Sequence, residues 1–108
     1  MQHMLEAARD ALSFIGGHSR SDLDGDRMLT LAVVKCIEII GEAASQVSAE
    51  CRAQHPSVPW RQATGTRNRL IHGYFEVDLD IVWDTVAQNL PPLVLELEQI
   101  LAQDREQS

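Results

Sequence analysis

The residues best suited to chemistry in this chain form one short string, RNRLIHGY, from Arg67 to Tyr74. Within it, His72 could exchange a proton near neutral pH, taking one from a ribose 2′-hydroxyl or giving one to a leaving 5′-oxygen. Arg67 could hold a phosphate with its planar set of N–H donors and stabilise the charge that develops there. These are groups that RNA cleavage without a metal ion needs. The alternative is that Arg67 and Arg69 are solvated on a helix and that His72 is a helix-end residue.

The spacing of Arg67 and His72 restricts how they could act together. Five residues correspond to about 140° around a regular helix, so these side chains could not lie side by side on one. Asn68 and His72, four residues apart, could. A joint site therefore requires that the helix unwinds at His72 and Gly73, or that groups from two chains meet at a twofold axis.

Apolar residues recur at steps of three and four through most of the chain, which predicts helices to position this string. Gly16 and Gly17 are expected to end the first helix, and Asp78 to cap the last. Pro91 and Pro92 are expected to kink or split that last helix. The expected helices cover about residues 5–15, 24–54 and 59–71, and the residues that follow Asp78.

A chain of 108 residues allows one domain. The predicted fold class is all-α, an antiparallel bundle of four or five helices over residues 1–103, with a polar tail at residues 104–108. No strand is expected, because valine and isoleucine follow helical rather than alternating patterns.

The second helix is apolar on two sides. Its main apolar stripe leaves several further apolar residues on another side, so that side is expected to pack against a partner subunit. These residues are Leu31, Val34, Ile37 and Ala44.

The net charge of −7 argues at first against a nucleic-acid partner. Residues 1–73 carry eight acids and eight bases, however, so residues 74–108 hold the whole excess. Residues 51–75 contain no acid but four arginines and two histidines. We therefore expect RNA to bind locally at one basic cleft around Arg67 and His72, with the acidic surplus facing away.

No pattern in the sequence indicates a metal or cofactor. Asp22, Asp24 and Asp26 begin like a calcium loop, but Arg27 and Val33 stand where that loop needs Gly and Glu. The histidines and cysteines show no metal-ligand spacing. No apolar run approaches the roughly 20 residues that span a bilayer, and no signal-peptide pattern is present. We expect a cytoplasmic protein with reduced cysteines and no membrane partner.

The order Arg, four residues, His, one residue, Tyr resembles the motif of HEPN-domain ribonuclease toxins, as in toxin–antitoxin systems of the HepT/MntA type. The resemblance covers nearly the whole chain. It includes IEIIGEAA at residues 37–44, the pair Pro59-Trp60, the core RNRLIHGYF at residues 67–75, and VDLDIVW at residues 77–83.

The resemblance implies a HEPN bundle that works as a homodimer, with a cleft between protomers, and that cleaves RNA without a metal ion. Arg67 and His72 would be the catalytic pair, and Asn68 would position the RNA at the same cleft. We assign Arg69 and Arg61 to RNA positioning as well.

The resemblance also implies regulation at Tyr74 by a minimal nucleotidyltransferase antitoxin, which would transfer AMP groups to its hydroxyl. The added phosphate would place negative charge and bulk beside Arg67 and His72 and block the RNA. The alternative for Tyr74 is a half-buried ring with a solvated hydroxyl. For the whole chain, the alternatives are a non-catalytic helical partner of a nucleotidyltransferase and a structural helical dimer.

Overall fold

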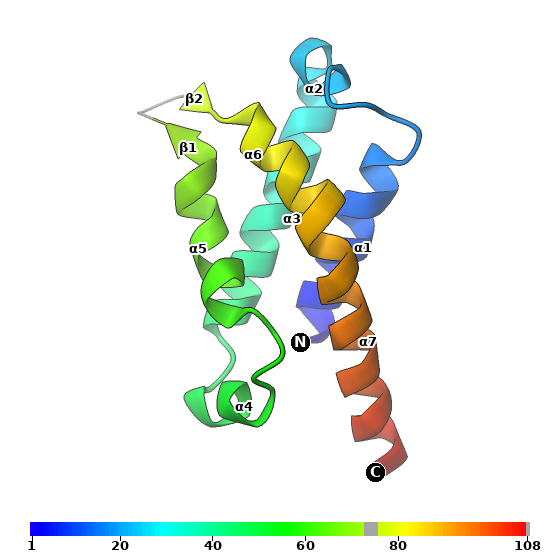
Figure 1. Cartoon of the computed structure of the whole chain (residues 1–108), viewed down its shortest axis with the longest axis vertical. Coiled ribbons are helices and arrows are strands. Elements are labelled where there is room, and N and C mark those ends of the chain that lie inside the picture. Colours follow the sequence, from blue (N-terminus) through cyan, green and yellow to red (C-terminus); the bar gives the residue numbers. More distant parts are fainter. Residues whose placement is uncertain (73–75, 108) are drawn as a thin grey trace.

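The computed structural model describes the backbone of residues 1–72 and 76–107 and the side chains of residues 1–65 and 77–103. Four helical rods run alternately up and down (Figure 1), so the predicted all-α antiparallel bundle is confirmed. The bundle is flat, with extents of 46 × 29 × 17 Å. Its elements are α1 (Gln2–Ile15), α2 (Asp22–Gly25), α3 (Arg27–Ser45), α4 (Ala49–Gln54), α5 (Trp60–Leu70), β1 (Ile71–His72), β2 (Glu76–Val77), α6 (Leu79–Asp84), the π-helical turn η1 (Thr85–Asn89) and α7 (Leu90–Gln107).

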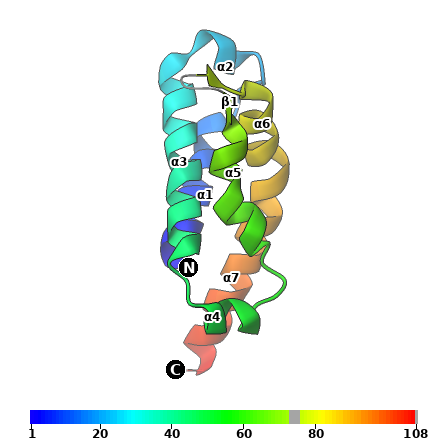
Figure 2. The ribbon, with the colours of Figure 1, turned by 90° about the vertical axis from the view of Figure 1, so that its left-hand side faces the viewer.

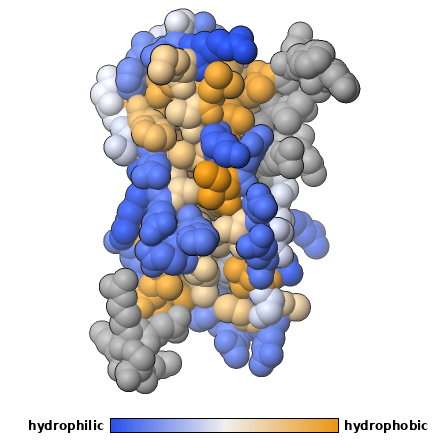
Figure 3. All heavy atoms as spheres, turned by 180° about the vertical axis from the view of Figure 1, so that it is seen from behind, coloured by the Kyte–Doolittle hydropathy of each residue, from blue (hydrophilic) through white to orange (hydrophobic). Residues whose placement is uncertain are grey.

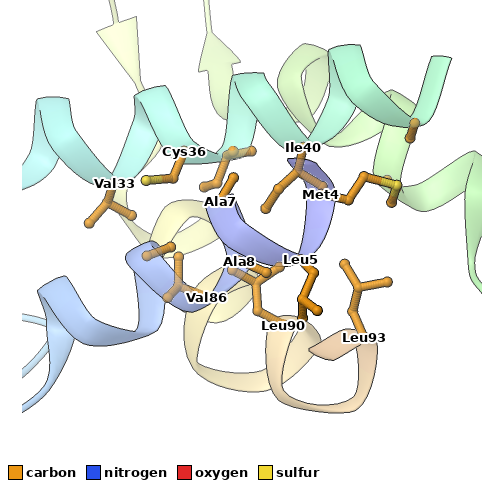
Figure 4. Packing of buried hydrophobic residues seen from close by; sticks show 14 of the residues in the cluster. Met4, Leu5, Ala7, Ala8, Val33, Cys36, Ile40, Val86, Leu90 and Leu93 are labelled. Carbon is orange, nitrogen blue, oxygen red and sulfur yellow. The ribbon is translucent and has the colours of Figure 1, made fainter. Parts of the chain in front are cut away.

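The core is aliphatic, in keeping with an aromatic content of 5%. Figure 4 shows buried side chains of α1 lying between α3 and the rod formed by η1 and α7. Alanines at this centre let the three helices approach closely, because they fill little volume. The labelled residues of this cluster are Met4, Leu5, Ala7, Ala8, Val33, Cys36, Ile40, Val86, Leu90 and Leu93.

The first helix ends where the glycine pair predicted. Gly16 follows the last residue of α1, and Gly17 has a φ of 80°, in the left-handed region that glycine adopts without strain. This turn starts the connection that leads into α2 and α3.

The second predicted helix is divided. Asp26 caps α3 by accepting a backbone N–H of the first turn at 3.0 Å, close to the expected start. The extension to Gln54 is wrong, because α3 ends at Ser45. Ser48 then starts the separate helix α4 by accepting the N–H of Cys51 at 3.0 Å. In a continuous helix, the first amides of α4 would donate to carbonyls of the preceding turn. Here the Ser48 side chain accepts one of these N–H groups instead.

The two apolar sides of α3 are mostly covered within the chain, because α3 packs against α5 as well as α1. Ile37 and Ala44 are buried, and Val34 packs partly against the core. For Ile37 and Ala44 the prediction that a partner subunit covers them is wrong, since the sequence did not show where α5 would lie. Leu31 stays 55% exposed.

The last rod consists of α6, η1 and α7 in succession. It starts as predicted, with the Asp78 side chain accepting the N–H of Ile81 at 3.1 Å. The interruption expected at Pro91 and Pro92 takes the form of the π-helical turn η1 just before them. Neither proline can donate a backbone hydrogen bond to this turn, which favours the wider winding. Helix α7 then continues to Gln107, past the boundary predicted at residue 103.

Candidate functional site

Helix α5 positions the candidate catalytic string and ends inside it. Arg61 and positions 67–69 belong to α5, which stops at Leu70. His72 lies in β1, in extended backbone. Of the two arrangements that the spacing allowed, the described chain has the first, because the helix has ended before His72. The 140° separation of a continuous helix therefore does not apply to Arg67 and His72.

A short antiparallel ladder follows, which the sequence analysis did not predict. β1 pairs with β2 so that Ile71 lies opposite Val77 and His72 opposite Glu76. β2 leads directly into α6, so the backbone of His72 is tied to the start of the last rod. The side chains of Arg67, Asn68, Arg69 and His72, and Tyr74 as a whole, lie outside the described residues.

A groove lies between the second half of α3 and the middle of α5. Thr64 lines it from α5, and its hydroxyl donates to the Arg61 carbonyl at 3.2 Å, while the Arg61 side chain is exposed. Positions 67 and 68 follow Thr64 by three and four residues, so they continue the same row of the helix. The groove carries charges of both signs. Its lining residues are Lys35, Glu38, Ile39, Gly41, Glu42, Ser45 and Thr64.

The first part of the basic stretch at residues 51–75 lies away from β1, so the expectation that the whole stretch surrounds Arg67 and His72 is wrong for that part. Arg52 lies in α4, and the carbonyl of His55 accepts the indole N–H of Trp60 at 3.0 Å. Both lie near the end of α5 that is opposite β1 (Figures 1 and 2). The two ends of α5 are separated by about 16 Å. Conversely, Glu76 and Asp80 belong to the acidic surplus that was expected to face away from the cleft. Both positions lie at the end of the molecule that carries β1, which we call the β1 end.

Arg20 is a cation at the β1 end that the sequence analysis missed. Its Nε donates to Asp80 at 2.7 Å, from the connection between α1 and α3 to the first turn of α6. This hydrogen bond is the main cause that raises the pKa of Arg20. No spacing rule could have found the pair, because the two residues lie 60 positions apart.

The described side chains offer no metal centre. Among them, no three His, Cys, Asp or Glu groups lie together in a way that could hold a metal ion. Cys36 is buried, and burial raises the pKa of its thiol, while Cys51 is half-buried and both are free. No helix within the described ranges is long and apolar enough to cross a membrane.

Comparison with known proteins decides the family. The family model described as "Ribonuclease HepT-like" matches residues 4–100. The chain belongs to the HepT-like ribonuclease family. This confirms the resemblance drawn from the string at residues 67–74 and the segments around it, and an RNA substrate follows from the family.

The HepT-like relatives match over most of their length. "Putative RNase TTE0752" from Caldanaerobacter subterraneus subsp. tengcongensis is 35% identical over 97% of this chain and 94% of its own. "Putative RNase MJ1380" from Methanocaldococcus jannaschii is 35% identical over 88% and 87%. "Probable ribonuclease HepT" from Thermococcus cleftensis is 34% identical over 89% and 91%. No solved structure matches the chain.

Proposed function

We propose that this HepT-like chain is the toxin of a toxin–antitoxin pair, a homodimeric endoribonuclease that cleaves RNA without a metal ion through Arg67 and His72. The observation that carries the proposal is the end of α5 at Leu70, followed by extended backbone at His72. A helix end between the two residues removes the geometric objection that their spacing raises on a continuous helix.

In the proposed reaction, the ribose 2′-oxygen attacks the adjacent phosphorus as the bond to the 5′-oxygen breaks. His72 takes the proton of the 2′-hydroxyl or gives a proton to the leaving 5′-oxygen, which contributes a factor of about 10²–10⁴ in rate. Arg67 stabilises the charge on the phosphate, and Asn68, Arg69 and Arg61 hold the strand. The products are a 2′,3′-cyclic phosphate and a 5′-hydroxyl.

Homodimer formation is supported by apolar residues that the protomer leaves exposed on α3. Met28 and Leu31 are 83% and 55% exposed, and Ile39 is 39% exposed further along the helix. Figure 3, which shows the molecule from the side opposite to that of Figure 1, has apolar residues along the middle of the face in view. Met28 and Leu31 lie at the end of α3 that is also the β1 end of the molecule (Figure 1). A dimer through this region would bring the two candidate sites toward each other.

Regulation at Tyr74 completes the proposal. A cognate minimal nucleotidyltransferase would form a phosphodiester between the Tyr74 oxygen and the α-phosphorus of ATP, with pyrophosphate leaving. Tyr74 follows His72 by two residues, so the added phosphate would compete for the groups that bind the RNA phosphate.

Expression in cells tests the proposal. The chain expressed alone should arrest growth with cleaved RNA, and co-expression with the nucleotidyltransferase should restore growth and add AMP to Tyr74, as mass spectrometry would show. Tyr74→Phe should stay toxic when co-expressed. Growth without RNA cleavage, together with AMP on Tyr74, would instead favour the non-catalytic partner.

A further inference from the structure

One arginine outside the motif joins two distant segments next to the ladder that carries His72. The Nε of Arg20 donates to Oδ1 of Asp80 at 2.7 Å, and its Nη1 donates to Oδ2 of Asp24 at 3.0 Å. Asp24 lies in α2, four residues along the chain, whereas Asp80 lies in the first turn of α6. The contact to Asp80 therefore links the connection between α1 and α3 to the last rod.

The segment that presents Arg20 is itself well anchored. Leu23 is only 3% exposed, and its carbonyl accepts the Thr30 hydroxyl at 2.9 Å. Asp22 accepts the Ser19 N–H at 2.9 Å and contacts the His18 ring at 3.0 Å, so the turn before α2 is closed on itself. Figures 1 and 2 both place α2 at the end of the molecule that carries β1 and β2.

The other residue of the contact, Asp80, comes shortly after β2, the strand that pairs with the strand of His72. Asp80 is three residues after Val77, the last residue of β2, and β2 pairs with β1 so that Glu76 lies opposite His72. On the inner side, α6 is held by the buried Val82. Arg20 adds a polar tie on the outer side, where Asp80 is 79% exposed.

We propose that Arg20 is a positioning residue: its contact with Asp80 holds β2 and the start of α6 in place, and β2 in turn holds the strand of His72. Only the RNA-cleavage part of its test rests on the function proposed above, since amide exchange reports on the ladder directly. An exposed ion pair changes a local equilibrium by a factor of up to about five, so the expected effects are of that size.

Four variants test the tie. Arg20→Gln and Asp80→Asn remove the ion pair of this tie, and Asp24→Asn removes only the ion pair within the connection. Arg9→Gln is the matched control, because Arg9 also makes an exposed ion pair between distant segments, with Glu98 at 3.0 Å, which joins α1 to α7. Amide exchange measured by NMR at residues 71, 72, 76 and 77 reports the opening of the ladder.

Exchange at these amides should be about two- to fivefold faster in Arg20→Gln and Asp80→Asn, and as in the wild type in Arg9→Gln and Asp24→Asn. Arg20→Gln should have no further effect when Asp80 is already Asn. With a fluorescent single-stranded RNA, kcat should fall by at most the same factor in the two variants while KM is unchanged, because kcat follows the fraction of molecules with the ladder closed.

Three results would overturn the role of Arg20. These are unchanged amide exchange in Arg20→Gln, an equal effect of Arg20→Gln with Asp80 already replaced, and a raised KM with unchanged kcat, which would make Arg20 a direct RNA contact. If the wild type cleaves no RNA, the proposed function fails, while amide exchange still decides whether Arg20 holds the ladder.

Discussion

The close approach of α3 and α5 can be tested at Gly41, which is buried on α3. A Cβ built at Gly41 would lie 3.2 Å from the Ala63 carbonyl oxygen and 3.8 Å from that of Thr64. The 3.8 Å contact is ordinary, but the 3.2 Å contact is tight. The Ala63 oxygen belongs to the backbone of α5, so it can give way only if the helix moves by a few tenths of an ångström. This contact sets how closely the helix that carries Arg67 lies against α3.

Two effects of Gly41→Ala oppose each other. Alanine in a helix interior is favoured over glycine by about 0.8–1.0 kcal/mol, while a tight contact with packed backbone costs about 1–3 kcal/mol. Gly41→Ala should therefore be neutral or destabilising by up to about 2 kcal/mol. Gly41→Leu gains a similar helix propensity but adds three more carbons at the same contact, so it should be clearly destabilising.

Gly65 is the matched control, because it lies in α5 and a Cβ built there meets nothing within 4 Å. Gly65→Ala should stabilise the fold by about 0.5–1 kcal/mol. Urea unfolding followed by circular dichroism, at one protomer concentration for all variants, measures each change. An equal stabilisation by Gly41→Ala and Gly65→Ala would refute the reasoning.

Three further predictions concern stability. Leu97 is fully buried, so Leu97→Ala should lower the free energy of unfolding by about 2–5 kcal/mol in urea; a loss below 1 kcal/mol would contradict its place in the core. Asp78→Ala should cost about 0.5–2 kcal/mol by removing the cap of α6, and Asp78→Asn should recover most of it. The Ser19 N–H and then the His18 ring lower the pKa of Asp22. Asp22 therefore stabilises the fold above about pH 4 and loses this contribution as the pH falls through its lowered pKa. Asp22→Asn should flatten the fall in stability between pH 7 and pH 3, and an unchanged pH profile would contradict the contact.

Much of the fold was predictable because its signals are local. Gly16-Gly17, Asp26 and Asp78 act on the residues beside them, so the end of α1 and the starts of α3 and α6 follow from the sequence. The break after Ser45 was missed because the apolar period continues through Val47, although Ser48 was present as a cap signal.

The candidate site residues stay a prediction, and the backbone conformation around them was predicted only in part. Residue type and spacing made Arg67 and His72 candidates. The change from helix to extended backbone after Leu70 has no local signal, since Leu70 and Ile71 suit either conformation. Strands of two residues are also too short to show an alternating pattern. Contacts such as Arg20–Asp80 depend on the packing of the rods and become visible only in three dimensions.

The central claim is that this HepT-like chain cleaves RNA through the 2′-hydroxyl, with His72 as the proton-transfer group. The most direct test offers the purified chain, in EDTA, an RNA and a matched oligonucleotide that carries a single 2′-deoxy residue at the mapped cleavage position. The account predicts cleavage of the RNA to a 2′,3′-cyclic phosphate and a 5′-hydroxyl, no cleavage at the 2′-deoxy position, and no activity in a folded His72→Ala variant. Cleavage at the 2′-deoxy position, or EDTA-resistant cleavage by clean His72→Ala protein, would contradict it.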